Sequence, residues 1–160
     1  DTQTMTFETF ILTDNIQEIF LVAGRVDYIV DAIDTVTAKL ALAQYAGEAG
    51  IPLISSMGTG NKLHPELFRI ADISETSVCP LCRVMRKELK SRGIQRLKVL
   101  FSTEKPVEPE PELEEQLIRE EISENSSRRS VPGSIAFVPP AAGLLIAGEV
   151  VRELASARGN

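Results

Sequence analysis

The chain has 160 residues, 43% of them hydrophobic and 25% charged, with a formal net charge of −6. This length is enough for one domain with a buried core, and the composition excludes a fibrous or low-complexity chain. The sequence shows neither an apolar run that would cross a bilayer nor a secretory leader at its start, and its two cysteines are too few for a secreted disulfide framework. We therefore expect a cytoplasmic protein that makes no membrane contact.

Alternating strands and helices are predicted by the apolar pattern. Short runs of β-branched and aromatic residues predict strands at 6–12, 27–33, 51–57, 66–74, 97–103 and 134–139. Apolar residues at helical spacing, with cap residues at the ends, predict helices at 13–21, 35–50, 79–93 and 140–159. Residues 27–57 form a βαβ unit, which implies two parallel strands. The expected fold is a single α/β domain over residues 1–160, with a partly parallel sheet and flanking helices.

The last predicted helix, 140–159, is amphipathic. Its apolar residues are Leu144, Ile146, Val150, Val151 and Leu154.

Charge is unevenly distributed along the chain. Residues 104–124 hold nine Glu against two basic residues, whereas residues 82–98 hold seven basic residues and one acidic residue. The overall acidity therefore does not exclude an anionic partner for the basic segment. The segment 104–132, rich in Pro, Glu and Ser, is predicted to be an exposed excursion from the domain, partly disordered.

Asp34 follows a predicted buried strand and opens the next helix. Ligands bind outside the carboxyl ends of the strands in open parallel sheets, so this carboxylate is a candidate binding group. One interpretation is a helix cap that accepts hydrogen bonds from the backbone N–H groups of Val36 or Thr37. The other is a ligand for Mg²⁺ on the phosphates of a nucleotide, since Mg²⁺ prefers one or two carboxylates plus phosphate oxygens. Both roles are compatible.

Five ordered segments carry a family resemblance over nearly the whole chain. They are "VDYIVDAIDTVTAKLAL", "GIPLISSMGTG", "ADISETSVCPLCRVMRKELKSRGI", "VLFSTEKP" and "GSIAFVPPAAGLLIAGEVVREL". Together they resemble the ThiF/MoeB/HesA superfamily of ubiquitin-activating-enzyme-like adenylating proteins. The "FSTE" run is most similar to the branch of the tRNA threonylcarbamoyladenosine dehydratases.

This resemblance implies a Rossmann-like fold that binds ATP and Mg²⁺ and activates a carboxylate by adenylation. In the dehydratase branch the carboxylate belongs to the threonyl group on a modified adenosine of tRNA, and its activation permits cyclisation with loss of water. The alternatives are a sulfur-carrier adenylyltransferase of the ThiF/MoeB type, working with a cysteine desulfurase and sulfur-carrier system, and a non-catalytic dimerisation or docking scaffold.

The resemblance also implies site residues. The family pattern D-(N/S/T)-x-x-x-(R/K) falls on Asp34, Thr35 and Lys39, with Asp34 as the catalytic, magnesium-binding residue. Lys39 fits less well, because a lysine at helical spacing is more often solvated. The turn Gly58-Thr59-Gly60 is expected to share the nucleotide cleft.

The glycine-rich phosphate loop of the family, of G-x-G-G-x-G type, has no counterpart in the 160 residues. The expectation is therefore a C-terminal part of an adenylating enzyme, without the N-terminal part of the nucleotide fold. Such a part is expected to be inactive alone and to pair with a second copy as a homodimer.

The CPLC motif has three interpretations: ordinary thiols, half of a zinc site, or a redox pair of Cys79 and Cys82. Zinc is not expected, because a structural site needs four ligands and His64 is the single histidine.

The basic helix that follows is either a solvated face or a contact for tRNA phosphates. The residues expected to make this contact are Arg83, Arg86, Lys87 and Lys90. The segment 83–98 contains no aromatic residue to stack on bases, so sequence readout is not expected.

Overall fold

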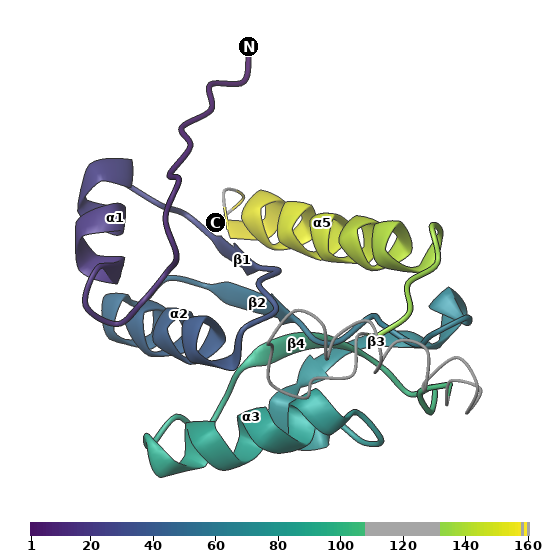
Figure 1. Ribbon diagram of the computed structural model, residues 1–160. Coiled ribbons are helices and arrows are strands. Elements are labelled where there is room, and N and C mark those ends of the chain that lie inside the picture. The colour runs from purple at the N-terminus through teal and green to yellow at the C-terminus, as the bar shows by residue number, and fades with distance from the viewer. Residues whose placement is uncertain (108–131, 158, 160) are drawn as a thin grey trace, which may run out of the picture.

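The computed structural model describes residues 1–107, 132–157 and 159. In this part of the chain a four-stranded sheet has the order β1-β2-β4-β3 and carries helices on both faces (Figure 1). The strands are β1 (Ile29–Asp31), β2 (Leu53–Ser56), β3 (Phe68–Asp72) and β4 (Lys98–Ser102). β1, β2 and β4 are parallel, whereas β3 pairs with β4 in the antiparallel direction. The α/β class with a mixed, mostly parallel sheet is confirmed.

Four helices and two 3₁₀ turns complete the described part. They are α1 (Ile16–Ala23), α2 (Val36–Ala49), η1 (Pro65–Leu67), η2 (Ile73–Glu75), α3 (Pro80–Ser91) and α5 (Val138–Ala157). The segment β1-α2-β2 is the predicted βαβ unit. α2 ends at Gly50, whose φ of 67° is the left-handed conformation that favours glycine after a helix.

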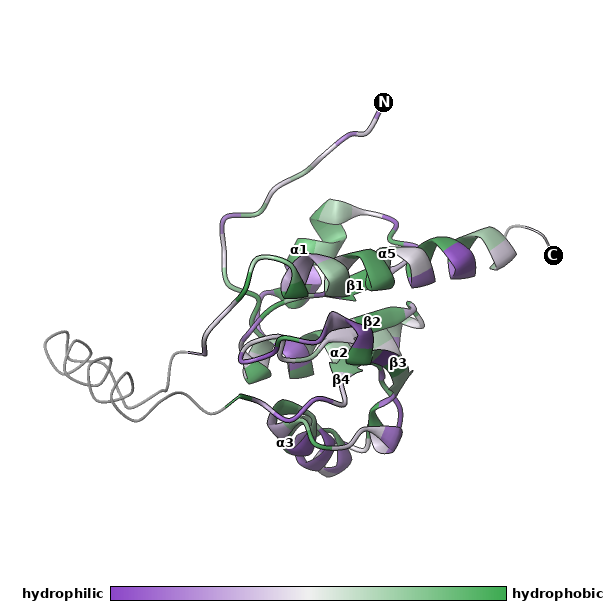
Figure 2. Cartoon of the chain, turned by 90° about the vertical axis from the view of Figure 1, so that its right-hand side faces the viewer, coloured by the Kyte–Doolittle hydropathy of each residue, from purple (hydrophilic) through white to green (hydrophobic). Residues whose placement is uncertain are grey.

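The core has one layer on each face of the sheet, because successive side chains of a strand point to opposite sides. Val99 and Phe101 of β4 pack with residues of α2 and α3, whereas Leu100 between them packs with Ile146 of α5. Figures 1 and 2 show the same arrangement, with α5 on one side of the sheet and α3 on the other. This leaves the carboxyl ends of β1 and β2 between α2 and α5.

Two predicted strands are wrong. Residues 6–12 contain no strand, because the hydrogen bonds of a strand require a neighbour and no described segment pairs with them. Residues 134–139 form a turn that enters α5 at Val138. Pro139 and Pro140 stand in the first turn of α5, where proline is tolerated because the N–H groups have no partner within the helix.

α5 uses fewer apolar residues for the core than the sequence suggested. Val138, Ala142 and Ile146 are buried at helical spacing, whereas the predicted apolar residues Leu144 and Val151 are 75% and 65% exposed. Most of the predicted acidic excursion, residues 108–131, lies outside the described residues.

Candidate functional site

Asp31 closes β1 at the carboxyl edge of the sheet. It lies opposite Ser55 of β2 in the parallel register, and both side chains are 1% exposed. Ser55 Oγ donates to Asp31 Oδ2 at 2.5 Å, and the backbone N–H of Ile33 donates to Asp31 Oδ1 at 3.0 Å. The carboxylate therefore joins the ends of two neighbouring strands.

Lys39 brings the opposite charge to Asp31. Its ammonium donates to Asp31 Oδ2 at 3.2 Å, to Ser55 Oγ at 3.3 Å and to the Ser56 carbonyl at 2.7 Å. The side chain is 1% exposed, so the expectation of a solvated lysine is wrong: α2 presents this side to the sheet edge. Burial lowers the pKa of Lys39, and the attraction of Asp31 opposes this effect. All three N–H groups of the ammonium are engaged.

Asp34 lies in the turn between β1 and α2, and it is exposed. Thr35, half-buried, is the N-cap of α2, so the interpretation of Asp34 as the cap is wrong. Among the hydrogen bonds of the described residues, the Asp34 carboxylate takes part in none. Its charge nevertheless acts on Lys39, which places it close to the buried ion pair.

A cleft of about 320 Å³ lies on the other side of this edge, against α5. Its lining residues are Val30, Ala32, Ser56, Thr59, Pro139, Ala142, Gly143, Ile146 and Ala147. Thr59 is the one predicted nucleotide-binding residue among them. The structure thus does not gather the predicted set into one cavity: Asp34 is exposed beside the edge, Lys39 is buried beneath it, and Gly58 and Gly60 flank Thr59.

Glu104 fixes the chain that follows the Gly58–Gly60 turn, a role that the sequence did not suggest. Its carboxylate accepts from the backbone N–H groups of Leu63 at 3.0 Å and His64 at 3.1 Å. The Lys62 ammonium donates to the Glu104 carbonyl at 2.6 Å. The "FSTE" run therefore ends in a buried acid that holds a segment 41 residues away.

Asn61 connects three segments of the chain, a role that no motif in the sequence indicates. Its N–H donates to the Gly133 carbonyl at 2.8 Å, and its Oδ1 accepts from the Gly133 N–H at 2.6 Å. Its carbonyl accepts from Val107 N–H at 2.8 Å. The neighbouring Gly60 cannot carry a side chain, because a Cβ there would lie 2.6 Å from Pro132 Cβ.

The predicted basic residues of α3 divide into two groups. Arg83, Lys87 and Lys90 are exposed on the hydrophilic outer side of the helix (Figure 2). Arg86 is half-buried and donates to the Thr76 carbonyl at 3.0 Å as well as to the Thr76 hydroxyl, so it connects α3 to the preceding turn. Arg86 and Lys90 also line a hollow of about 390 Å³ at the end of α3.

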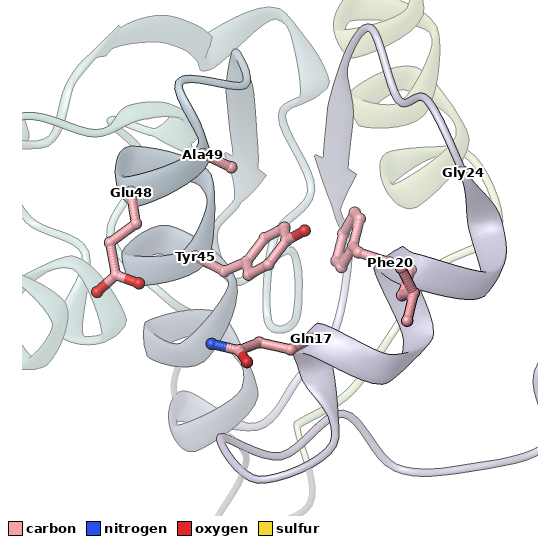
Figure 3. A pocket seen from close by; sticks show the side chains of 7 residues that line it. Gln17, Phe20, Gly24, Tyr45, Glu48 and Ala49 are labelled. Carbon is pink, nitrogen blue, oxygen red and sulfur yellow. The ribbon is translucent and has the colours of Figure 1, made fainter.

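A larger hollow of about 540 Å³ lies between α1 and α2 (Figure 3). The rings of Phe20 and Tyr45 stack there with centroids 4.4 Å apart. None of the residues predicted for nucleotide or tRNA lines this hollow, and it lies apart from the carboxyl ends of the strands.

Comparison with known proteins gives the family. The profile of the ThiF family matches residues 1–159. The chain belongs to the ThiF family. The tRNA threonylcarbamoyladenosine dehydratase of Bacillus subtilis is 40% identical over 129 residues, which cover 80% of this chain and 50% of that protein. The dehydratase of Escherichia coli is 32% identical over 111 residues, 64% of this chain and 41% of that protein.

Solved structures have the same fold. The crystal structure of E. coli tRNA N6-threonylcarbamoyladenosine dehydratase in complex with AMP has a TM-score of 0.77 at 23% identity, and covers 96% of this chain and 58% of that one. A structure of TcdA (CsdL) has a TM-score of 0.74 at 26% identity, and covers 94% of this chain and 57% of that one. This ThiF-family chain thus spans about half the length of the relatives it matches. Within the residues that the structure describes, no helix is both long enough and apolar enough to cross a bilayer.

Proposed function

We propose that this chain forms part of an ATP-dependent tRNA threonylcarbamoyladenosine dehydratase. The protein would activate the threonyl carboxylate of the modified adenosine by adenylation and so drive cyclisation with loss of water. The observation that carries the proposal is the position of Asp34: an exposed carboxylate in the turn that follows β1, a parallel strand of a ThiF-family sheet. The 40% identity to the Bacillus subtilis dehydratase supports this branch over the sulfur-carrier adenylyltransferases.

Asp34 suits the magnesium ion that ATP chemistry needs. Mg²⁺ takes one or two carboxylates and completes its shell with phosphate oxygens and water, so a single exposed carboxylate is a fitting donor. When bound, the ion would neutralise phosphate charge during adenylation. Ser56 and Thr59, which line the cleft against α5, are proposed to contact the nucleotide, together with the turn residues Thr35 and Gly58.

Lys39 is proposed as a positioning residue. An ammonium whose three N–H groups bond to Asp31, Ser55 and Ser56 has no donor left for a phosphate. It instead joins the ends of β1 and β2 to the first turns of α2. This fixes the turn that presents Asp34.

Turnover is the direct test of this function. The whole protein that contains this chain is incubated with ATP, Mg²⁺ and tRNA that bears threonylcarbamoyladenosine, and nucleoside mass spectrometry follows the loss of one water. We expect Asp34→Asn to lower kcat at least about 100-fold, which corresponds to about 2.7 kcal/mol of transition-state stabilisation. Its free energy of unfolding should change by less than about 0.5 kcal/mol, because the side chain is exposed.

Asp14→Asn, at another exposed aspartate, is the matched control and should keep full turnover. Normal turnover in Asp34→Asn would refute the magnesium role. Adenylation of a sulfur-carrier protein without conversion of tRNA would replace the dehydratase by the alternative function.

The 160 residues by themselves are expected to be inactive. Nucleotide affinity in such folds comes largely from backbone N–H groups of a glycine-rich turn at a helix N-terminus, and these residues contain no such run. Calorimetry with ATP and Mg²⁺ should detect no binding. Micromolar affinity would mean that the residues of the α5 cleft form a phosphate site of their own.

The tRNA contact is proposed for the exposed cations of α3. Replacement of Arg83, Lys87 and Lys90 by Ser should lower the slope of log affinity against log salt by about 2 to 3, since each phosphate contact contributes nearly one unit. Binding should show little preference among tRNA sequences. Arg25→Ser, which removes an exposed arginine before β1, is the control. An unchanged slope in the triple variant would assign these residues to solubility.

Self-association is proposed as well. Val30 of β1 is 49% exposed, and Leu144 and Val151 of α5 are 75% and 65% exposed, so apolar surface is left at the edge strand and on α5. Burial of such surface favours a homodimer. Light scattering should give twice the monomer mass, and a monomer at micromolar concentration would refute this.

A further inference from the structure

The C-x-x-C pair stands at the start of α3. Cys79 is the N-cap and Cys82 the third residue of the helix; they are 5% and 0% exposed, and both are free thiols. The backbone N–H of Cys82 donates to Cys79 Sγ at 3.5 Å, so the Cys79 sulfur lies against Cys82.

Cys79 Sγ lies at the N-terminus of α3, where the Cys82 N–H donates to it. The backbone N–H groups of Leu81 and Gly58 also act to lower the pKa of Cys79. The buried ammonium of Lys62 adds an electrostatic attraction. Burial alone would disfavour a thiolate, but here the hydrogen bond from Cys82 and those from the backbone lower the pKa of Cys79 to about 6.

The pKa of Cys82 is shifted in the opposite direction. Its hydrogen bond to Cys79, together with burial, raises the pKa of Cys82 far above the ordinary thiol range, although Thr76 and Arg86 act in the other direction. Cys79, whose sulfur accepts from a backbone N–H at the start of α3, is therefore the sulfur that forms a thiolate more readily, and Cys82 is the one that stays protonated. This is the division of roles between an attacking sulfur and a resolving sulfur.

The residue before the pair is strained. Val78 has a φ of 63°, and the N–H of Cys79 donates to the Ser77 carbonyl at 2.6 Å across it, which makes a tight γ-turn. A β-branched residue rarely adopts this conformation, and such strain is concentrated at functional sites. Val78 is 42% exposed and Gly58 is exposed, so Cys79 lies directly beneath the surface.

We propose that Cys79 and Cys82 form a redox-active dithiol that reduces hydroperoxides. The Cys79 thiolate attacks one peroxide oxygen and breaks the O–O bond, which gives a sulfenic acid and, from hydrogen peroxide, hydroxide. The Cys82 sulfur then attacks the Cys79 sulfur and water leaves. In total one dithiol and one hydrogen peroxide give one disulfide and two waters, and two electrons pass from sulfur to oxygen.

A metal role for the pair lacks further ligands in the residues that the structure describes. No group of three or more His, Cys, Asp or Glu residues gathers there in a way that would hold an ion. The dithiol also stands independently of the proposed adenylation, although Gly58 links it to the turn next to the cleft.

The test follows the mass and the thiol content of the folded protein. Reduced protein is treated with hydrogen peroxide at pH 7, then blocked with N-ethylmaleimide and weighed intact. We expect the loss of two hydrogens without added oxygen, together with loss of both alkylation sites; the chain has just two cysteines, so the assignment is direct. In Cys82→Ser, dimedone should trap a sulfenic acid on Cys79. In the matched Cys79→Ser variant, Cys82 should stay unmodified.

Iodoacetamide provides a second measurement on the unmodified chain. The alkylation rate of Cys79 should rise with a midpoint near pH 6, whereas an ordinary thiol titrates at about 8.5. Three results would overturn the proposal. They are disulfide formation only after denaturation, an alkylation midpoint of Cys79 at about pH 8.5 as for an ordinary thiol, and stoichiometric zinc on the purified protein. The measurements on the wild-type chain decide the matter even if Cys82→Ser fails to fold.

Discussion

The buried ion pair between Lys39 and Asp31 gives the sharpest test of the described geometry. Lys39→Met removes one charge and leaves the Asp31 carboxylate at 1% exposure with only Ser55 and the Ile33 N–H as donors. Breaking a buried pair by removing one partner typically costs about 3–5 kcal/mol, because the remaining charge is neither solvated nor compensated. That is a large share of the total stability of a domain of this size, which is about 5–15 kcal/mol.

Equilibrium unfolding in urea measures this cost. With a denaturant slope of about 2 kcal/mol per molar, the midpoint of Lys39→Met should fall by about 1.5–2.5 M. Asp31→Asn should also be strongly destabilising, since it leaves the ammonium buried among neutral groups. Lys87→Met makes the same substitution at an exposed lysine of α3 and should move the midpoint little.

The double variant Asp31→Asn/Lys39→Met completes the cycle. With both charges removed, the Asn amide oxygen can accept from the Ile33 N–H while its NH2 group donates to Ser55 Oγ, so the double variant should be more stable than the sum of the single losses implies, by at least about 1 kcal/mol. Single losses below about 1 kcal/mol, or strict additivity, would refute the description of this pair as buried and coupled.

Other predictions concern contacts between elements. Lys98→Met should cost about 1 kcal/mol, because Lys98 of β4 bonds to Glu149 and Glu153 of α5 at partly exposed positions. Hydrogen bonds from Arg152 and Lys98 lower the pKa of Glu149 below its ordinary 4.5. The stabilisation by Lys98 should therefore be full above about pH 4.5 and disappear as the pH falls through the folded-state pKa of Glu149. Acid unfolding of the wild-type chain and of Lys98→Met measures this difference. Glu104→Gln should lower the free energy of unfolding in urea by about 1–3 kcal/mol, because the NH2 group of glutamine would face a backbone N–H from which the Glu104 carboxylate accepts. No loss of stability would mean that the segment Leu63–His64 does not depend on Glu104 for its position.

The local patterns of the sequence predicted most of the fold. The βαβ unit, α3 and β4 were found because strand runs and helix caps are local signals, and Gly50 and Pro80 stand where such signals place them. The predicted strand at 134–139 ends in Pro139, although proline equally favours the start of a helix, and α5 begins at Val138. The run 6–12 alternates as a strand does, but a strand also needs a partner, and a local pattern does not supply one.

The candidate site was predicted less completely, because its contacts are long-range. The spacing placed Asp34 at the edge of the sheet, where the structure has it. The sequence pattern does not predict the pair of Asp31 and Lys39, because Lys39 lies eight residues on, across a turn, and a lysine at helical spacing is more often solvated. Glu104 and Asn61 act on segments 41 and 72 residues away, and no periodicity encodes such a pairing.

The hydrogen bonds of Asn61 have a consequence for insertions and deletions in the chain. Val107 and Gly133, which lie on either side of residues 108–131 in the sequence, both bond to this one residue. Asn61 therefore fixes the chain on both sides of residues 108–131. Insertions or deletions between Val107 and Gly133 should leave the register of the sheet unchanged.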